Sequence, residues 1–179
     1  MDLTEKPISR IEVFSGRILT MRVDRVQLPD GRESTRELVS HPGGVGVAAL
    51  TDGGELLLVQ QYRYPYGAVL TEIPAGKRDP GEEPLETGRR ELEEETGYVA
   101  DRYEPLGTVY PSPGYTDEVI HLYLATGLHK TAAHPDEGEF LHVLRCPLSR
   151  LVQQALAGEL PDAKTQIAIL KVWQKMGGK

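Results

Sequence analysis

The feature that most constrains how this chain folds is the stretch of residues 76–98, which reads GKRDPGEEPLETGRRELEEETGY. Its first six residues include two glycines, a proline and an aspartate, a composition typical of a loop. Pro84 suits the first position of a helix, and Gly97 suits the residue just past a helix end. The stretch therefore predicts a loop that leads into a helix over residues 84–96.

Three acidic residues lie close together on that helix. Glu91, Glu94 and Glu95 are spaced i, i+3 and i+4, which places their carboxylates on one helix face. Clustered carboxylates repel each other, whereas a hard cation such as Mg²⁺ binds a few carboxylates together with phosphate oxygens. Alone, the acidic residues would fit a solvated helix face better than a metal site. The preceding glycine loop, Arg90 and Gly97 favour a metal site.

The same stretch resembles the Nudix box, a family pattern written G-x5-E-x7-R-E-U-x-E-E-x-G-U, in which U is a bulky apolar residue. The positions that match in register are Gly76, Glu82, Arg90, Glu91, Leu92, Glu94, Glu95 and Gly97. Tyr98 is aromatic at the last position, where an aliphatic residue is usual, and this difference concerns packing. The chain thus resembles the Nudix hydrolases.

This resemblance implies a role for each matching residue. Glu91 and Glu95 correspond to the main metal ligands, Glu94 to a further ligand, and the carbonyl of Ala75 to a backbone ligand. Two or three Mg²⁺ ions per site are implied, with Mn²⁺ as the alternative metal. Arg90 and Glu82 correspond to an ion pair that holds the loop against the helix. The remaining positions, which are structural, are Gly76, Leu92 and Gly97.

Stretches outside the box resemble one group within the family, the ADP-ribose pyrophosphatases. They are residues 16–19 (GRIL), 60–63 (QQYR), 112–118 (SPGYTDE) and 136–139 (DEGE). The resemblance implies cleavage of the pyrophosphate of ADP-ribose, or of a similar nucleoside-diphosphate sugar, to give AMP and ribose 5-phosphate. The alternatives are an enzyme for another nucleotide sugar, such as GDP-mannose, and a catalytically silent nucleotide-binding module.

The group resemblance also implies the substrate-binding residues and a homodimer with exchanged N-terminal strands. Arg17, Ile18 and Glu37 would reach the adenosine half of the substrate from the partner subunit, and Arg63 would meet the diphosphate or the adenosine side. An isolated β lobe needs a surface on which to bury its apolar side chains, and a partner subunit would provide one. The substrate loop would contribute Pro113, Gly114 and Glu118.

The acidic loop near residue 138 would supply the base that activates water. Glu139 is the first candidate and Glu137 the second, because Gly138 and His142 depart from the usual pattern of the group. An exposed acidic loop without a catalytic role is the alternative. The implied catalytic residues are Glu139, Glu137, Glu94 and Arg90.

Hydropathy and turn patterns predict a mixed α/β sandwich with an N-terminal antiparallel β lobe. The resemblance implies that its fold class is a Nudix-type α/β/α sandwich with a mixed β-sheet. The lobe covers residues 1–43 and the hydrolase domain residues 44–179. Predicted strands cover residues 17–28, 33–39, 45–50, 55–61, 68–73, 105–110, 118–125 and 140–145. Predicted helices cover residues 84–96, 148–157 and 163–176, with Asp162 as an N-cap and Gly177–Gly178 as a stop.

Composition limits the function classes. The 20 Lys and Arg residues against 27 Asp and Glu residues give a formal net charge of −7, which disfavours a broad electrostatic grip on nucleic acid. No stretch approaches the 18 or so apolar residues of a membrane-spanning helix. Cys146 is the single cysteine and cannot form an internal disulfide. These observations predict a cytoplasmic protein with a small-molecule substrate.

Overall fold

The computed structural model describes residues 2–134, 138 and 140–178. The chain divides into two compact units, of which the first contains residues up to 43 together with residues 110–119. The second contains residues 44–109 and 120–179.

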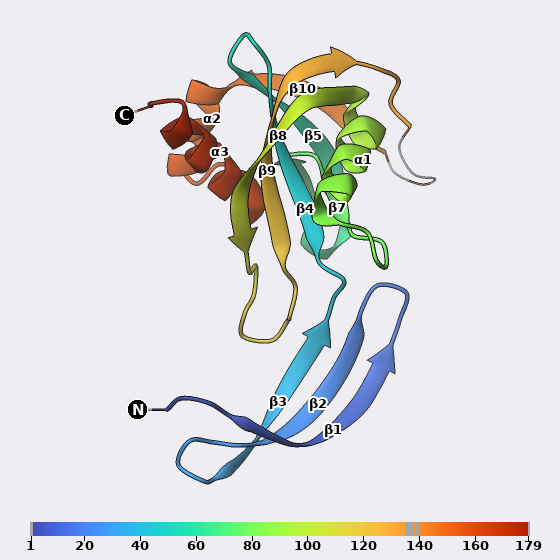
Figure 1. The fold of residues 1–179 in the computed structure, drawn as a ribbon, viewed down its shortest axis with the longest axis vertical. Coiled ribbons are helices and arrows are strands. Elements are labelled where there is room, and N and C mark those ends of the chain that lie inside the picture. Colours follow the sequence, from blue (N-terminus) through green and yellow to red (C-terminus); the bar gives the residue numbers. More distant parts are fainter. Residues whose placement is uncertain (1, 135–137, 139, 179) are drawn as a thin grey trace. The chain divides into compact units, whose positions relative to one another are not determined.

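The first unit is built on a three-stranded antiparallel sheet with the order β1-β2-β3 (Figure 1). Its strands are β1 Lys6–Ser15, β2 Thr20–Gln27 and β3 Glu33–Ser40. The predicted β2–β3 hairpin is confirmed, and its turn contains Gly31 at a φ of 87°. Strand β1 was not predicted from the sequence, because two irregularities of register, at Pro7/Ser9 and Glu12/Phe14, break the alternation that marks a strand.

The segment 110–119 belongs to the first unit although its flanking strands belong to the second. Thr116 forms a parallel bridge with Val39 at the end of β3. The carboxylate of Asp117 accepts hydrogen bonds from the hydroxyl of Ser40 and the backbone N–H of His41, each 2.9 Å long. These contacts fix the loop that contains the predicted substrate-binding residues to the end of β3.

The second unit contains a mixed seven-stranded sheet. Five strands follow the order β10-β5-β4-β9-β8, β6 pairs with β5, and β7 pairs with β4. The β4–β9 pairing is parallel and the others are antiparallel. The strands are β4 Gly44–Leu50, β5 Glu55–Arg63, β6 Ala68–Glu72, β7 Ala75–Lys77, β8 Tyr98–Val109, β9 Ile120–Lys130 and β10 His142–Pro147.

Helices cover both faces of this sheet. Helix α1 (Pro84–Thr96) lies on one face, and α2 (Leu148–Leu156) and α3 (Ala163–Lys175) lie on the other (Figure 1). A short 3-10 helix, Tyr64–Tyr66, joins β5 to β6. The α/β/α sandwich with a mixed sheet and an N-terminal antiparallel lobe is thereby confirmed. No helix in the described ranges is long and apolar enough to span a membrane.

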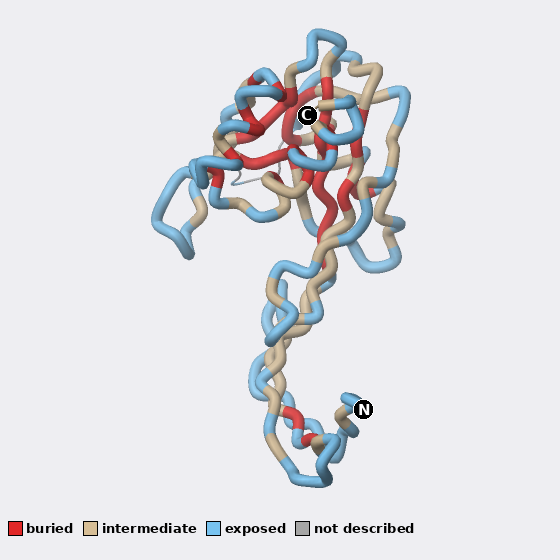
Figure 2. The backbone as a smooth tube through the Cα atoms, turned by 90° about the vertical axis from the view of Figure 1, so that its left-hand side faces the viewer, coloured by how far each residue is buried: buried red, intermediate tan, exposed pale blue. Residues whose placement is uncertain are grey.

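The core of the second unit lies between the sheet and the helices on its two faces. Figure 2 shows its buried residues in red. On the α1 face, Leu92 packs with Val45, Val47 and Leu57, and all four are fully or nearly fully buried. Gly88 lets the helix approach the sheet, because a Cβ atom there would lie 3.1 Å from Val45. A larger cluster packs α2 and α3 against the other face.

Candidate active site

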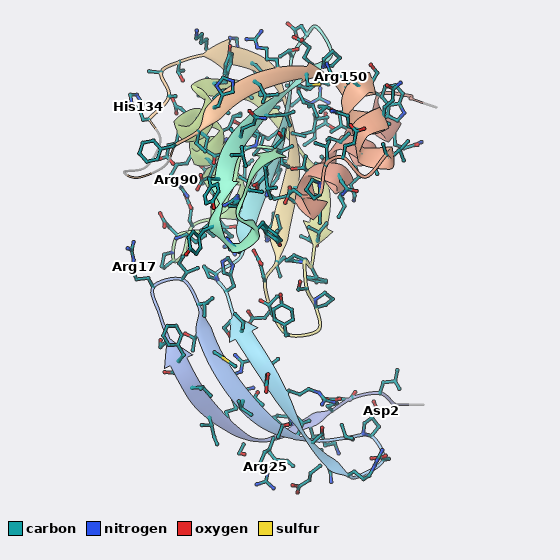
Figure 3. The ribbon with its side chains drawn as sticks, turned by 180° about the vertical axis from the view of Figure 1, so that it is seen from behind. Asp2, Arg17, Arg25, Arg90, His134 and Arg150 are labelled. Carbon is teal, nitrogen blue, oxygen red and sulfur yellow. The ribbon has the colours of Figure 1, made fainter. Side chains whose placement is uncertain are left out.

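Arg90 organises the polar side of α1 and is labelled in Figure 3. Its guanidinium donates to both oxygens of Glu82 at 3.1 Å, and its Nη1 donates at 2.9 Å to the carboxylates of Glu91 and Glu94. The hydrogen bonds to Glu82 are the main cause that raises the pKa of Arg90 above its usual value. One cation therefore links the loop before the helix to two acidic residues of the helix.

Glu82 is held in the turn that precedes α1. Besides Arg90, the hydroxyl of Thr87 and the backbone N–H of Asp79 donate to its carboxylate, at 2.7 and 3.2 Å. The hydrogen bonds from Arg90, followed by those from Thr87 and Asp79, lower the pKa of Glu82 from 4.5 to about 2. Glu82 is thus an ionised anchor that fixes the loop relative to the helix.

Gly76 makes room for Glu91. A Cβ atom built on Gly76 would lie 2.0 Å from Oε1 of Glu91 and 2.3 Å from Oε2. Such distances lie far inside van der Waals contact, so any other residue at position 76 would displace the carboxylate. The Glu91 side chain therefore lies directly against the backbone of β7. The interpretation of residues 76–81 as a loop throughout is wrong for its first two residues, because residues 75–77 pair with β4.

Glu95 meets the same stretch of backbone. The N–H of Ala75 donates to Oε2 of Glu95 at 2.8 Å, and Glu95 is only 4% exposed although it is acidic. Two carboxylates one helical turn apart thus converge on residues 75–76. This convergence results from the pairing of β7 with β4 beneath α1.

The donor set agrees with a hard divalent cation. Mg²⁺ uses one or two protein carboxylates and completes its shell with water and phosphate oxygens. Glu91 and Glu95 supply two carboxylates beside the Ala75–Gly76 backbone, in a space that only glycine leaves free. Nη1 of Arg90 pairs with Glu94 and also with Glu91. Among the described residues, no group of three or more His, Cys, Asp and Glu side chains is gathered closely enough to hold a metal.

Arg63, at the end of β5, lies beside this region. Its Nε and Nη2 each donate to Glu72 at 2.7 Å, a two-pronged ion pair. The hydrogen bonds to Glu72 raise the pKa of Arg63, and the negative charges of Asp162 and Glu95 raise it further. The guanidinium thus lies within the electrostatic field of the carboxylate that contacts Ala75.

The other predicted substrate-binding residues lie in the first unit. Arg17 and Ile18 occupy the β1–β2 turn, where both are exposed and Arg17 points outward (Figure 3). Glu37 is exposed on β3. In the loop 110–119, Pro113 and Gly114 are exposed, and Glu118 lies 3.5 Å from Nδ1 of His41. Leu92 and Gly97, predicted as structural, are buried in α1 and at its C-terminal end.

The two candidate bases, Glu137 and Glu139, lie outside the described residues. Their role as the base stays a prediction from the resemblance.

Three polar residues near Arg63, of which two are buried and one is partly buried, were not predicted from the sequence. They are Glu72, Lys164 and Thr165, which connect β6 and the following loop to the start of α3. Glu72 stands in a strand pattern and Lys164 in the first turn of a helix, so neither had a local signal. Because 91 residues separate Glu72 from Lys164 in the chain, no local pattern predicts their contact.

Two domain families match the chain. Residues 40–167 match the model of the NUDIX domain, and residues 5–39 match the nucleoside diphosphate sugar hydrolase N-terminal domain. The chain is 46% identical to a methanol dehydrogenase activator of Bacillus methanolicus, with 92% of this chain and 90% of that protein covered. It is 43% identical to an ADP-ribose pyrophosphatase of Bacillus subtilis (strain 168), with 93% and 91% covered.

A solved structure shares the fold over nearly the whole length. It is the crystal structure of an ADP compounds hydrolase, and it superimposes with a TM-score of 0.85 at 24% identity. The alignment covers 99% of this chain and 98% of the other. At this identity the likeness concerns the fold alone.

Proposed function

The chain belongs to the Nudix family, and we propose that it hydrolyses the pyrophosphate of ADP-ribose or a closely similar nucleoside-diphosphate sugar, with AMP and ribose 5-phosphate as the products. The similarity to an ADP-ribose pyrophosphatase along nine-tenths of both chains supports the substrate. The convergence of Glu91 and Glu95 on the backbone of residues 75–76 is the structural observation that carries the proposal.

Members of this family generally work with divalent metal ions. In this chain Glu91, Glu95 and the carbonyl of Ala75 would hold Mg²⁺ or Mn²⁺, and Glu94 would join them once released from Arg90. Two or three ions are proposed per site. Bound there, the metal would supply charge neutralisation at the diphosphate and a more acidic water.

The protein's own residues bind and orient the substrate around this site. Arg90 holds the loop through Glu82 and keeps Glu91 and Glu94 in reach, so it acts on the alignment of the acidic residues. Arg63 is held by Glu72 through Nε and Nη2, and its Nη1 would donate to a phosphate oxygen. Glu139, with Glu137 as the second candidate, would accept the proton of the attacking water.

The proposal also covers assembly and location. We infer a homodimer in which the N-terminal strands, residues 1–43, are exchanged, so that Arg17, Ile18 and Glu37 contact the adenosine half from the partner. Pro113, Gly114 and Glu118 would line the substrate loop. We also infer a small anionic substrate and a cytoplasmic location. The formal net charge of −7 disfavours nucleic acid as the substrate.

A substrate panel tests the function. Purified protein with Mg²⁺ is incubated with ADP-ribose, GDP-mannose and other nucleoside-diphosphate sugars, and the phosphate released from the products by phosphatase is measured. We expect ADP-ribose to show the highest kcat/KM. A clear preference for GDP-mannose would move the chain to the other nucleotide-sugar enzymes. Binding without turnover of any substrate would favour the silent module.

The Glu95→Gln variant tests the assignment of the carboxylates. Gln keeps the shape and an oxygen that can accept the Ala75 N–H, but it lacks the negative charge that a cation requires. We expect kcat with Mg²⁺ to fall by about two orders of magnitude or more, with an unchanged circular dichroism spectrum. Glu159→Gln, an exposed substitution after α2, is the matched control. Activity at the wild-type level in Glu95→Gln would contradict the assignment.

A further inference from the structure

Glu72 is a buried carboxylate that is shared between two cations. It is 1% exposed, and its Oε1 and Oε2 accept from Nε and Nη2 of Arg63. Oε2 also accepts from the ammonium of Lys164 in the first turn of α3. Burial acts to raise the pKa of Glu72, but the contacts with Arg63 and Lys164 outweigh it and lower the pKa from 4.5 to about 2.

Lys164 is held in place by its own helix. Its ammonium lies 3.1 Å from Oδ1 of Asp162, and only 11% of its side chain is exposed. The other oxygen of Asp162 accepts the N–H of Thr165 at 2.9 Å and caps the helix. The lysine thus has a defined position between two carboxylates, unlike a surface lysine, whose side chain samples many rotamers.

The same helix turn also holds the backbone that leads to the metal-binding stretch. The hydroxyl of Thr165 accepts the N–H of Ile73 at 2.9 Å, and both residues are fully buried. Ile73 directly follows Glu72 and stands two residues before Ala75. The start of α3 therefore binds the chain twice, at the Glu72 side chain and at the Ile73 amide, just before it enters the candidate active site.

We propose that Lys164 is a positioning residue for this reaction, because it holds the second side of Glu72 and so fixes the guanidinium of Arg63 for the phosphate of the substrate. This inference rests on the proposed function and deepens it. Lys164 is not assigned any contact with substrate or metal. Its effect is transmitted through Glu72, whose Oε2 accepts from both Arg63 and Lys164.

The charge balance around Glu72 gives a second reason to expect that Lys164 affects substrate binding. Arg63 and Lys164 carry two positive charges, and Glu72 and Asp162 carry two negative ones, so the buried cluster is neutral overall. Without Lys164 the cluster has one uncompensated negative charge. That charge would strengthen the hold of Glu72 on Arg63 and would repel an anionic diphosphate. Loss of the lysine should therefore weaken substrate binding more than an equivalent change elsewhere on α3.

The test compares Lys164→Met with Lys175→Met. Lys175 is on the same helix and also pairs with a glutamate, Glu104, but that pair is at the surface. Dissociation constants for ADP-ribose are measured by calorimetry in EDTA, where no turnover occurs, and kcat and KM are measured with Mg²⁺. We expect Lys164→Met to raise Kd and KM about tenfold, Lys164→Arg to recover most of the loss, and Lys175→Met to match the wild type.

A double-mutant cycle with Arg63→Lys separates positioning from a general structural effect. Arg63→Lys keeps a positive charge beside Glu72 but removes the two-pronged guanidinium. If Lys164 acts through Arg63, Lys164→Met should have little further effect on Kd in the Arg63→Lys background. Fully additive effects in the cycle, or an unchanged Kd in a folded Lys164→Met variant, would overturn the proposal.

Two further outcomes are informative. If Lys164→Met and a second variant, Lys164→Gln, both fail to fold by circular dichroism, the lysine is a stability residue and the positioning role is overturned. A wild-type chain that binds ADP-ribose without hydrolysing it would overturn the proposed function, while the binding cycle would still decide the role of Lys164. A wild-type chain that binds no nucleoside-diphosphate sugar would overturn both.

Discussion

At the scale of single residues, the candidate site depends on contacts with little tolerance for change. The Glu91 carboxylate occupies the place where a side chain at position 76 would begin, and Glu95 accepts the adjacent Ala75 N–H. Arg90 joins Glu82, Glu91 and Glu94 through one guanidinium. Each residue is recognisable in the sequence, but the reason for its identity is visible only in these contacts.

Replacement of Gly76 by alanine should impair catalysis rather than folding. The new methyl group would meet the Glu91 carboxylate at about 2 Å, so the carboxylate must rotate away from the metal-binding position. Because small misplacements of reacting groups are costly, we expect kcat/KM for ADP-ribose to fall about 100-fold. Steady-state kinetics with Mg²⁺ would measure this. Gly53→Ala, whose nearest neighbour is a Thr51 atom at 3.7 Å, should have wild-type activity.

Glu72 should make the protein sensitive to acid. Its pKa of about 2 in the folded state lies below the ordinary 4.5, so folding favours the ionised carboxylate. This contribution is fully present above about pH 4.5 and is lost as the pH falls toward 2, and its upper limit is on the order of 3 kcal/mol. Urea unfolding between about pH 6 and pH 3 should show a weaker pH dependence for Glu72→Gln than for the wild type or Glu159→Gln. Equal slopes would contradict the assignment.

At the scale of elements, local sequence signals located the helices well. Helix α1 has the predicted bounds, with Pro84 at its start and Gly97 after its end at a φ of 68°. Helix α3 begins after Asp162, whose side chain accepts the Thr165 N–H as an N-cap. Strands β1 and β7 were missed for a physical reason. The alternation in β1 is broken by register shifts, and β7 has three residues and depends on β4 for its hydrogen bonds.

The cap of α3 should contribute measurably to stability. Asp162→Ala removes the acceptor for the Thr165 N–H and the partner of Lys164, so we expect the free energy of unfolding to fall by about 1–2 kcal/mol. Asp162→Asn keeps a capping oxygen and should lose less. Chemical denaturation of both variants beside the wild type would measure the difference. If both variants lost the same amount, the ion pair with Lys164, rather than the cap, would be the main contribution.

At the scale of the whole molecule, the two units differ in how they bury apolar surface. The second unit encloses its core between helices on both faces of a sheet. The first unit is a three-stranded sheet, and every residue of its strand β1 is exposed, including Ile11, Val13 and Phe14. Several large exposed apolar side chains on one strand are unusual in a monomer and support the proposed exchange of N-terminal strands.

The dimer can be tested on β1. Ile11 is 61% exposed, and Ile11→Glu places a charge on the surface that the partner would cover. We expect analytical ultracentrifugation to show a dimer for the wild type and a shift toward monomer for the variant. Turnover should fall at least tenfold if Arg17 and Glu37 act across the interface. Leu156→Glu, at a 75% exposed leucine at the end of α2, should remain dimeric and active. A monomeric wild type would refute strand exchange.

Patterns within short segments were enough to predict the three helices, the hairpin of the first unit, the carboxylate face of α1 and the family resemblance, because capping, turn formation and helical spacing act over a few residues. Long-range packing alone established that residues 75–77 pair with β4 under Glu91, and that residues 110–119 bind the end of β3. It also placed Lys164 on Glu72. These contacts join residues far apart in the chain. They stabilise the fold only when the sheet has formed and water has been excluded from its edges.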